Sequence, residues 1–94
     1  MLNVHQLNVF ATAAETLNFT QTAKRLHLTQ SSVSQHIKAL ENQLGVDLFV
    51  RKGRTLEITD AGNVLVPMAK EVVEGSIRAS EQMELLKQEI HGHL

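Results

Sequence analysis

The residues best suited to chemistry lie along one predicted helix, at positions 30–44, and their chemistry is hydrogen bonding rather than catalysis. Spacings of three and four residues place hydroxyls, amides and one ammonium group on a common helix face: Ser31, Ser34, Gln35, Lys38 and Asn42. The first two turns of that face contain no carboxylate. Such a face can exchange hydrogen bonds with the base edges of a nucleic acid, because an α-helix fits the major groove.

Different side chains on this helix suit different parts of a duplex. Gln30 and Gln35 can each donate and accept toward a base edge, and Ser31 and Ser34 can pair with bases or phosphates. Lys38 lies about one turn further on and suits a phosphate. Alone, a polar face is equally typical of any solvent-exposed helix, and only the elements around it favour a role in binding.

A basic turn, Lys52-Gly53-Arg54-Thr55, follows between short β-prone runs at 48–51 and 56–58. The pattern predicts a hairpin with glycine near its tip. The tip has little to bury, so we expect it to project into solvent, where its arginine can enter a minor groove of negative potential. The alternative is a solvated turn whose charges only maintain solubility. The candidate DNA contacts in this segment are Arg51, Lys52 and Arg54.

Two earlier helices are predicted to position this surface. The first has an apolar face of Leu7, Phe10, Ala11, Ala14 and Leu17. Asn18 interrupts it, and Thr20 occupies the position expected for the N-cap of a short second helix. Thr29 is the next capping candidate, after a connection of about three residues, 27–29. Helices joined so tightly must cross steeply, which predicts a helix-turn-helix.

The third helix carries an apolar stripe opposite its polar face. The stripe consists of Val33, Ile37, Leu40 and Leu44. Gly45 follows as a left-handed stop. We therefore expect this helix to be anchored on one side and available for binding on the other.

A long final helix is predicted from about Thr59 and Asp60, which can cap it, to about Ile90. Pro67 lies early in it and should weaken or kink it. Apolar and small residues repeat strictly at spacings of four and three: Leu65, Ala69, Val72, Ser76, Ala79, Met83, Leu86 and Ile90. The first turns can pack within the chain, but the rest of this seam predicts a dimer. The expected interface residues are Val72, Ala79, Met83, Leu86 and Ile90.

The net charge of −1 hides an uneven distribution of charge along the chain. Basic residues dominate from Thr20 to Ile58, whereas acidic residues dominate from Thr59 onward. The local sign matters more than the sum for a polyanionic partner. The middle of the chain therefore suits nucleic acid despite the slightly negative total.

Composition excludes several other classes of protein. The 94 residues suit one small domain with an appended helix, and without cysteine there is no disulfide, thiolate zinc site or cysteine nucleophile. No apolar run predicts a membrane span and no signal peptide opens the chain, so we expect a cytoplasmic protein. His5, His27 and His36 fall in separate elements, and the pair His91 and His93 lacks further ligands, so neither a metal site nor any cofactor is expected. No catalytic constellation is visible.

Many of these positions resemble the N-terminal domain of LysR-type transcriptional regulators. The resemblance rests first on the run Phe19-Thr20-x-x-Ala23-x-x-Leu26-x-Leu28-Thr29-Gln30-Ser31-x-Val33-Ser34-x-x-Ile37-x-x-Leu40-Glu41-x-x-Leu44-Gly45-Val46-x-Leu48-Phe49-x-Arg51. It continues in Leu56-x-Ile58-Thr59-x-Ala61-Gly62. It covers essentially the whole chain.

The resemblance implies a mainly α fold, a winged helix-turn-helix of three helices and a two-stranded wing followed by a long linker helix. The implied organisation is a DNA-binding domain at 1–58, a linker and dimerisation helix at 59–90 and a hinge at 91–94 toward an effector-binding domain beyond this chain. Family members bind partly palindromic duplex DNA as dimers with antiparallel linker helices. They usually form tetramers as pairs of dimers. Their separate effector domain senses a small molecule, so the chain is expected to be a fragment of a protein roughly threefold longer.

The resemblance also implies roles for individual residues. Gln30, Ser31, Ser34 and Gln35 match the family's recognition residues, Arg54 matches its wing arginine, and Thr29 and Lys38 match backbone-contacting positions. Two departures are visible: Ser31 and Ser32 stand where the family often has proline or alanine, and Gln35 where it frequently has arginine. An amide at position 35 favours adenine over the guanine that arginine binds.

A second hypothesis is a protein-interaction module that dimerises through the long helix and uses the helix-turn-helix only as a scaffold. The carboxylate-free face beside a basic hairpin tip favours DNA binding, because protein binding requires neither feature.

Overall fold

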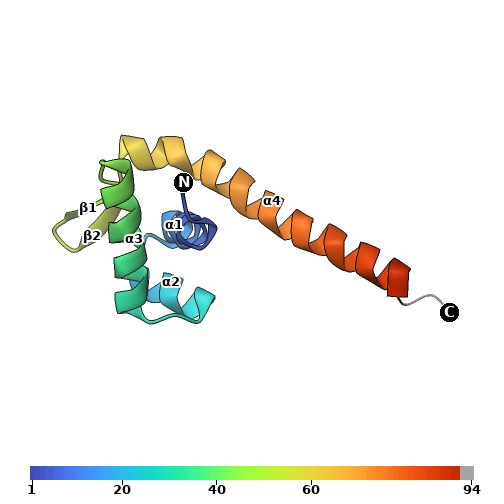
Figure 1. The fold of residues 1–94 in the computed structure, drawn as a ribbon. Helices are drawn as coiled ribbons and strands as arrows, with labels where there is room; N and C mark the ends of the chain where they lie inside the picture. The colour runs from blue at the N-terminus through green and yellow to red at the C-terminus, as the bar shows by residue number, and fades with distance from the viewer. Residues whose placement is uncertain (92–94) are drawn as a thin grey trace.

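The computed structural model describes residues 1–91 and contains four helices and one small sheet (Figure 1). The elements are, in order, α1 (Val4–Thr16), α2 (Phe19–Leu26), α3 (Gln30–Leu44), β1 (Phe49–Lys52), β2 (Thr55–Ile58) and α4 (Asp60–His91). This order confirms the predicted fold class. Helices α1–α3 and the sheet gather at one end, while α4 runs away from them, giving a molecule of 61 × 24 × 18 Å (Figure 1).

The start of α2 differs from the sequence-based prediction. Asn18, not Thr20, is the N-cap: its backbone is extended and its side chain accepts a hydrogen bond from the Gln21 amide. The helix begins earlier than expected because α1 ends at Thr16, and its C-cap residue Leu17 adopts the left-handed conformation at φ 49°. Leu17 was predicted on the buried face of α1, but at this cap it is 41% exposed. Thr20 lies inside the first turn of α2 and is free to bond elsewhere.

The short connection between α2 and α3 has the predicted length. His27 ends α2 in the left-handed conformation, at φ 57°, and the next amide, of Leu28, donates to the Ala23 carbonyl at 2.8 Å. Thr29 then caps α3 by accepting from the Ser32 amide at 3.1 Å. The predicted helix-turn-helix and the predicted cap of α3 are therefore confirmed.

The core lies where α1, α3 and the base of the sheet meet. The largest completely buried side chains are Phe10, Leu40, Leu48, Val9, Val33 and Thr22. Thr22 is tolerated there because its hydroxyl hydrogen-bonds Thr16 and the Asn18 carbonyl. In the predicted stripe of α3, Val33, Ile37 and Leu40 are buried and Leu44 is half-buried, so its inward side is as expected.

The predicted wing is a two-stranded antiparallel hairpin. Lys52 pairs with Thr55, so only Gly53 and Arg54 lie between the strands. Gly53 has φ +63°, as the first central residue of a two-residue type II′ hairpin turn requires. The tip of the hairpin projects away from the core (Figure 1), and both Gly53 and Arg54 are exposed.

Helix α4 is joined closely to the domain at its start. Thr59 caps it by accepting from the Gly62 amide at 3.0 Å, and the Thr59 hydroxyl donates to the Asp47 carbonyl at 2.6 Å. A Cβ on Gly62 would approach the Leu48 carbonyl oxygen to 2.6 Å, so only glycine permits this close approach. Figure 1 shows α4 changing direction early in its course, and this part contains Pro67, as predicted.

Helix α4 packs on the domain as far as Val73 and then leaves it. Ala69 is buried against the core and Val73 is partly buried, but the five predicted dimer residues are all exposed in the single chain: Val72, Ala79, Met83, Leu86 and Ile90. Among residues 1–91, no helix combines the length and apolarity that crossing a membrane requires. The predicted hinge begins at His91, which is still helical, and otherwise lies outside the described residues.

Candidate nucleic-acid interface

The polar face of α3 is fully available at the surface. Every candidate contact that the sequence placed on or before this helix is exposed: Thr29, Gln30, Ser31, Ser34, Gln35 and Lys38. The side chains are presented rigidly because the opposite stripe of the same helix is buried in the core. The expected separation of an anchored side and an available side is confirmed.

Folding brings the wing beside the N-terminal end of α3. A polar hollow between them is lined by Leu17, Asn18, Phe19, Thr20, Gln30, Arg51, Arg54 and Leu56. Two of the predicted wing residues, Arg51 and Arg54, therefore share one hollow with Gln30 of the recognition helix. Lys52 instead lies 3.5 Å from Glu57 on the neighbouring strand, in an exposed ion pair. The hollow thus combines two guanidinium groups with neutral polar side chains, which suits a phosphate or a base edge.

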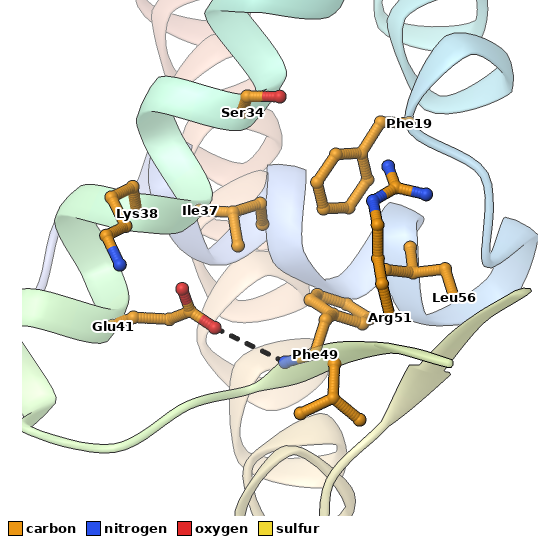
Figure 2. Close-up of a pocket in the computed structure, with 9 residues that line it drawn as sticks. Phe19, Ser34, Ile37, Lys38, Glu41, Phe49, Arg51 and Leu56 are labelled. Atoms are coloured by element: carbon orange, nitrogen blue, oxygen red, sulfur yellow. Dashed lines mark hydrogen bonds between the residues drawn. The ribbon is translucent and has the colours of Figure 1, made fainter. Parts of the chain in front are cut away.

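A second hollow lies along the side of α3 that faces the wing (Figure 2). It is lined by Phe19, Ser34, Ile37, Lys38, Glu41, Phe49, Val50, Arg51 and Leu56. The guanidinium of Arg51 lies 5.9 Å from the centre of the Phe19 ring, and the rings of Phe19 and Phe49 form a T-shaped pair with centroids 5.7 Å apart. This cation–π contact orients Arg51 between the two hollows.

Phe19 is a residue whose role the sequence did not reveal. It is half-buried and positions Arg51 from a different element, a contact that no spacing rule within one helix predicts. The only available signal was an aromatic residue at the beginning of a short polar helix.

Glu41 joins α3 to the root of the wing. One of its carboxylate oxygens accepts hydrogen bonds from the amides of Leu48 and Phe49, at 2.7 Å and 3.3 Å; Figure 2 shows the second. The carboxylate on this side of α3 is therefore engaged by backbone donors rather than facing a phosphate. The wing keeps a fixed position relative to the recognition helix as a result.

We expect Glu41→Ala to destabilise the protein by about 1–2 kcal/mol, because two partly buried amides lose a charged acceptor. DNA affinity should fall more than this stability loss explains, since the wing is released. Thermal unfolding and DNA titration at a temperature where both proteins are folded measure the two effects. Glu81→Ala, which removes an exposed carboxylate from α4, away from both hollows, is the control. Equal DNA affinity for Glu41→Ala and the unmodified protein would contradict the role of this carboxylate.

The remaining charged and imidazole side chains lie outside the two hollows. Arg25 pairs with Glu15 at 2.6 Å, and because both side chains are about half exposed the pair contributes little stability. The ring centroids of His5 in α1 and His36 in α3 lie 4.7 Å apart. Within the part of the chain that the structure describes, no group of three or more His, Cys, Asp or Glu side chains could hold a metal ion.

Comparison with protein families gives one match that covers most of the domain. The model of the family described as "Bacterial regulatory helix-turn-helix protein, lysR family" matches residues 4–63. These residues extend from α1 through the wing to the first turn of α4. The matched region therefore contains both hollows and the whole exposed face of α3.

Individual relatives are similar over nearly the full chain. An uncharacterised HTH-type transcriptional regulator of Azotobacter vinelandii is 39% identical over 93 residues, which are 99% of this chain and 65% of that protein. The HTH-type transcriptional activator AmpR of Providencia stuartii is 38% identical over 98% of this chain and 30% of its own length. The chain thus spans from about a third to under two thirds of these two relatives.

A solved structure agrees in three dimensions. The crystal structure of the CbnR_DBD–DNA complex matches with a TM-score of 0.81 and 32% sequence identity, covering 92% of this chain and 99% of that one. That protein was crystallised with DNA.

Proposed function

The chain belongs to the lysR family of bacterial regulatory helix-turn-helix proteins, and on this basis we propose how its domain reads duplex DNA. Membership makes it a DNA-binding domain of transcription regulators and not an enzyme. In our proposal α3 enters the major groove and the tip of the wing reaches the adjacent minor groove. The protein acts in the cytoplasm, where it meets bacterial DNA.

One observation carries this proposal. The exposed face of α3 has hydroxyl, amide and ammonium groups, and the nearest carboxylate, Glu41, is held by the Leu48 and Phe49 amides. Beside that face lie the guanidinium groups of Arg51 and Arg54. The surface thus offers donors to bases and positive charge to phosphates, and the Glu41 carboxylate beside it is directed at backbone amides. The contacts proposed are Thr29, Gln30, Ser31, Ser34, Gln35, Lys38, Arg51, Lys52 and Arg54.

We further propose that two copies bind together through α4. Its apolar residues remain exposed along the part of the helix that leaves the domain, with Met83 61% and Ile90 60% exposed. Pairing two such seams buries them and holds two α3 helices at a fixed spacing. A dimer of this kind would read two related half-sites, so the proposed target is partly palindromic.

The tetramer, the small-molecule effector and the hinge at 91–94 belong to the same proposal. These three features are proposed because the chain resembles longer regulators such as AmpR, and the match to AmpR covers 30% of that protein's length. A tetramer would form from two dimers, and an effector would bind through a domain following α4.

Substitutions on α3 and on the wing should have different effects. Ser34→Ala and Gln35→Ala should each weaken binding to a cognate duplex by roughly 1–3 kcal/mol and relax the base preference, because they remove base contacts. Arg54→Ala should lower affinity for cognate and random duplexes more uniformly and reduce the salt dependence. Titrations on both duplexes at several salt concentrations measure this. Arg78→Ala, an equal charge loss on α4, is the control.

Unchanged cognate affinity in both Gln35→Ala and Arg54→Ala would exclude this docking geometry.

The protein-interaction hypothesis is tested more simply, by a gel shift on random duplex at low salt. A basic DNA-binding surface retains measurable non-specific affinity under that condition. Absence of any shift would favour an interaction module built around α4.

A further inference from the structure

A hydrogen bond links the two helices of the helix-turn-helix at the proposed DNA surface. The hydroxyl of Thr20, in the first turn of α2, donates to Oε1 of Gln30, the first residue of α3, at 3.1 Å. Both side chains are exposed and both line the polar hollow beside the wing. The bond therefore lies on the surface that the proposed function turns toward DNA.

Thr20 is not needed to begin its own helix. Asn18 caps α2, with its side-chain oxygen 2.9 Å from the Gln21 amide. The Thr20 hydroxyl is therefore directed to Gln30, ten residues away in the sequence. A threonine in this place fixes the orientation of a glutamine that would otherwise rotate freely in solvent.

The orientation decides what Gln30 offers. A glutamine amide has one acceptor oxygen and two N–H donors on its nitrogen. Here the oxygen is turned toward Thr20, and the hollow that both residues line also contains Arg51 and Arg54, whose guanidinium groups only donate. The nitrogen, with both donors, is left for an external partner.

We infer that Thr20 is a positioning residue that makes Gln30 a reader of hydrogen-bond acceptors. This inference rests on the proposed function. An unrestrained glutamine pairs with adenine, to which it donates at N7 and from which it accepts at N6. With its oxygen directed at Thr20, Gln30 presents its N–H donors outward, which suits guanine, with acceptors at N7 and O6, or thymine, with an acceptor at O4. Within residues 1–91, no side chain holds the Gln35 amide by a comparable hydrogen bond, so Gln35 keeps the adenine preference expected from its sequence position.

Selection of bound duplexes from a random pool tests the inference in the full chain. Gln30→Ala identifies the base position that Gln30 reads, as the position whose preference it abolishes. The unmodified protein should prefer guanine or thymine there by about tenfold. Thr20→Val removes the hydroxyl, keeps the β-branched shape and leaves the Asn18 cap intact. It should reduce this preference to about twofold or less, or shift it to adenine, while other positions stay unchanged.

Thr20→Ser, which keeps the hydroxyl, should retain the preference of the unmodified protein. Adding Thr20→Val to Gln30→Ala should change affinity no further, because Thr20 acts only through Gln30. An adenine preference in the unmodified protein, or an unchanged preference in Thr20→Val, would overturn the inference. So would a further loss of affinity in the double variant, which would mean that Thr20 touches DNA itself.

The same selection distinguishes failure of the proposed function from failure of this inference. If the unmodified protein enriches no sequence from the pool, then sequence-specific binding itself is wrong. If it enriches a site and Gln30→Ala alters no position of that site, the docking survives and only the role of Gln30 and Thr20 is refuted. Melting temperatures of all variants confirm that each protein is folded.

Discussion

Replacing Leu86 with glutamate is expected to convert a dimeric protein into a monomer and to weaken binding to a two-half-site duplex by about 100-fold or more. Leu86 lies on the exposed seam of α4 and is 46% exposed in the single chain. In the proposed dimer its side chain is covered by the other copy. A carboxylate there would be buried without a partner, which costs several times more than the lost apolar contact. Affinity for DNA falls because each monomer then binds one half-site without the help of its neighbour.

Sedimentation at several protein concentrations measures the oligomeric state. Gln88→Glu is a close control, since it adds the same charge two residues away on the opposite, exposed side of α4. It should leave both dimer and DNA affinity intact. A Leu86→Glu protein that stays dimeric would show that the two chains meet through another surface.

The second large effect concerns the anchor of the recognition helix. We expect Leu40→Ala to lower the free energy of unfolding by about 3 kcal/mol, because a completely buried leucine is replaced by a small side chain and leaves a cavity. In a domain of this size the melting temperature should fall by roughly 15 °C. Stability of small domains is on the order of 5–15 kcal/mol, so one substitution removes a large share. DNA binding at elevated temperature should fail with it.

Calorimetry or circular dichroism at one fixed protein concentration measures this, since dimerisation makes the melting temperature depend on concentration. Leu40→Met keeps the volume and should cost less than about 1.5 kcal/mol. Asn42→Ala, on the exposed side of the same helix, should lower the free energy of unfolding by less than about 0.5 kcal/mol. A Leu40→Ala protein as stable as Asn42→Ala would contradict the burial of this stripe.

Much of the domain was predictable because it depends on contacts between residues close in sequence. The spacing of Val33, Ile37 and Leu40 determined which side of α3 is buried, and Thr29 and Gly45 marked its two ends. Gly53 marked the tip of the wing, and the length of the α4 seam indicated that only its first turns could pack on so small a domain. Each of these signals extends over a few residues, which is the range of helix periodicity and of capping.

The start of α2 shows where such local signals became ambiguous. Asn18 and Thr20 are both good capping residues, and the choice between them depended on where α1 ended. That end was decided at Leu17, whose left-handed backbone no apolar periodicity predicts. Thr20 was thereby released to bond Gln30.

The tertiary structure alone decided how the exposed polar groups are oriented. Arg51 lies over Phe19, Glu41 holds the root of the wing, and Thr20 restrains Gln30. In each pair the partners belong to different elements, so their distance is set by the packing of those elements and not by spacing along the chain. The sequence by itself therefore determined that α3 presents a polar, carboxylate-free face in its first turns. Only the fold decided which of those groups are free to donate or accept, because that depends on neighbours brought from elsewhere in the chain.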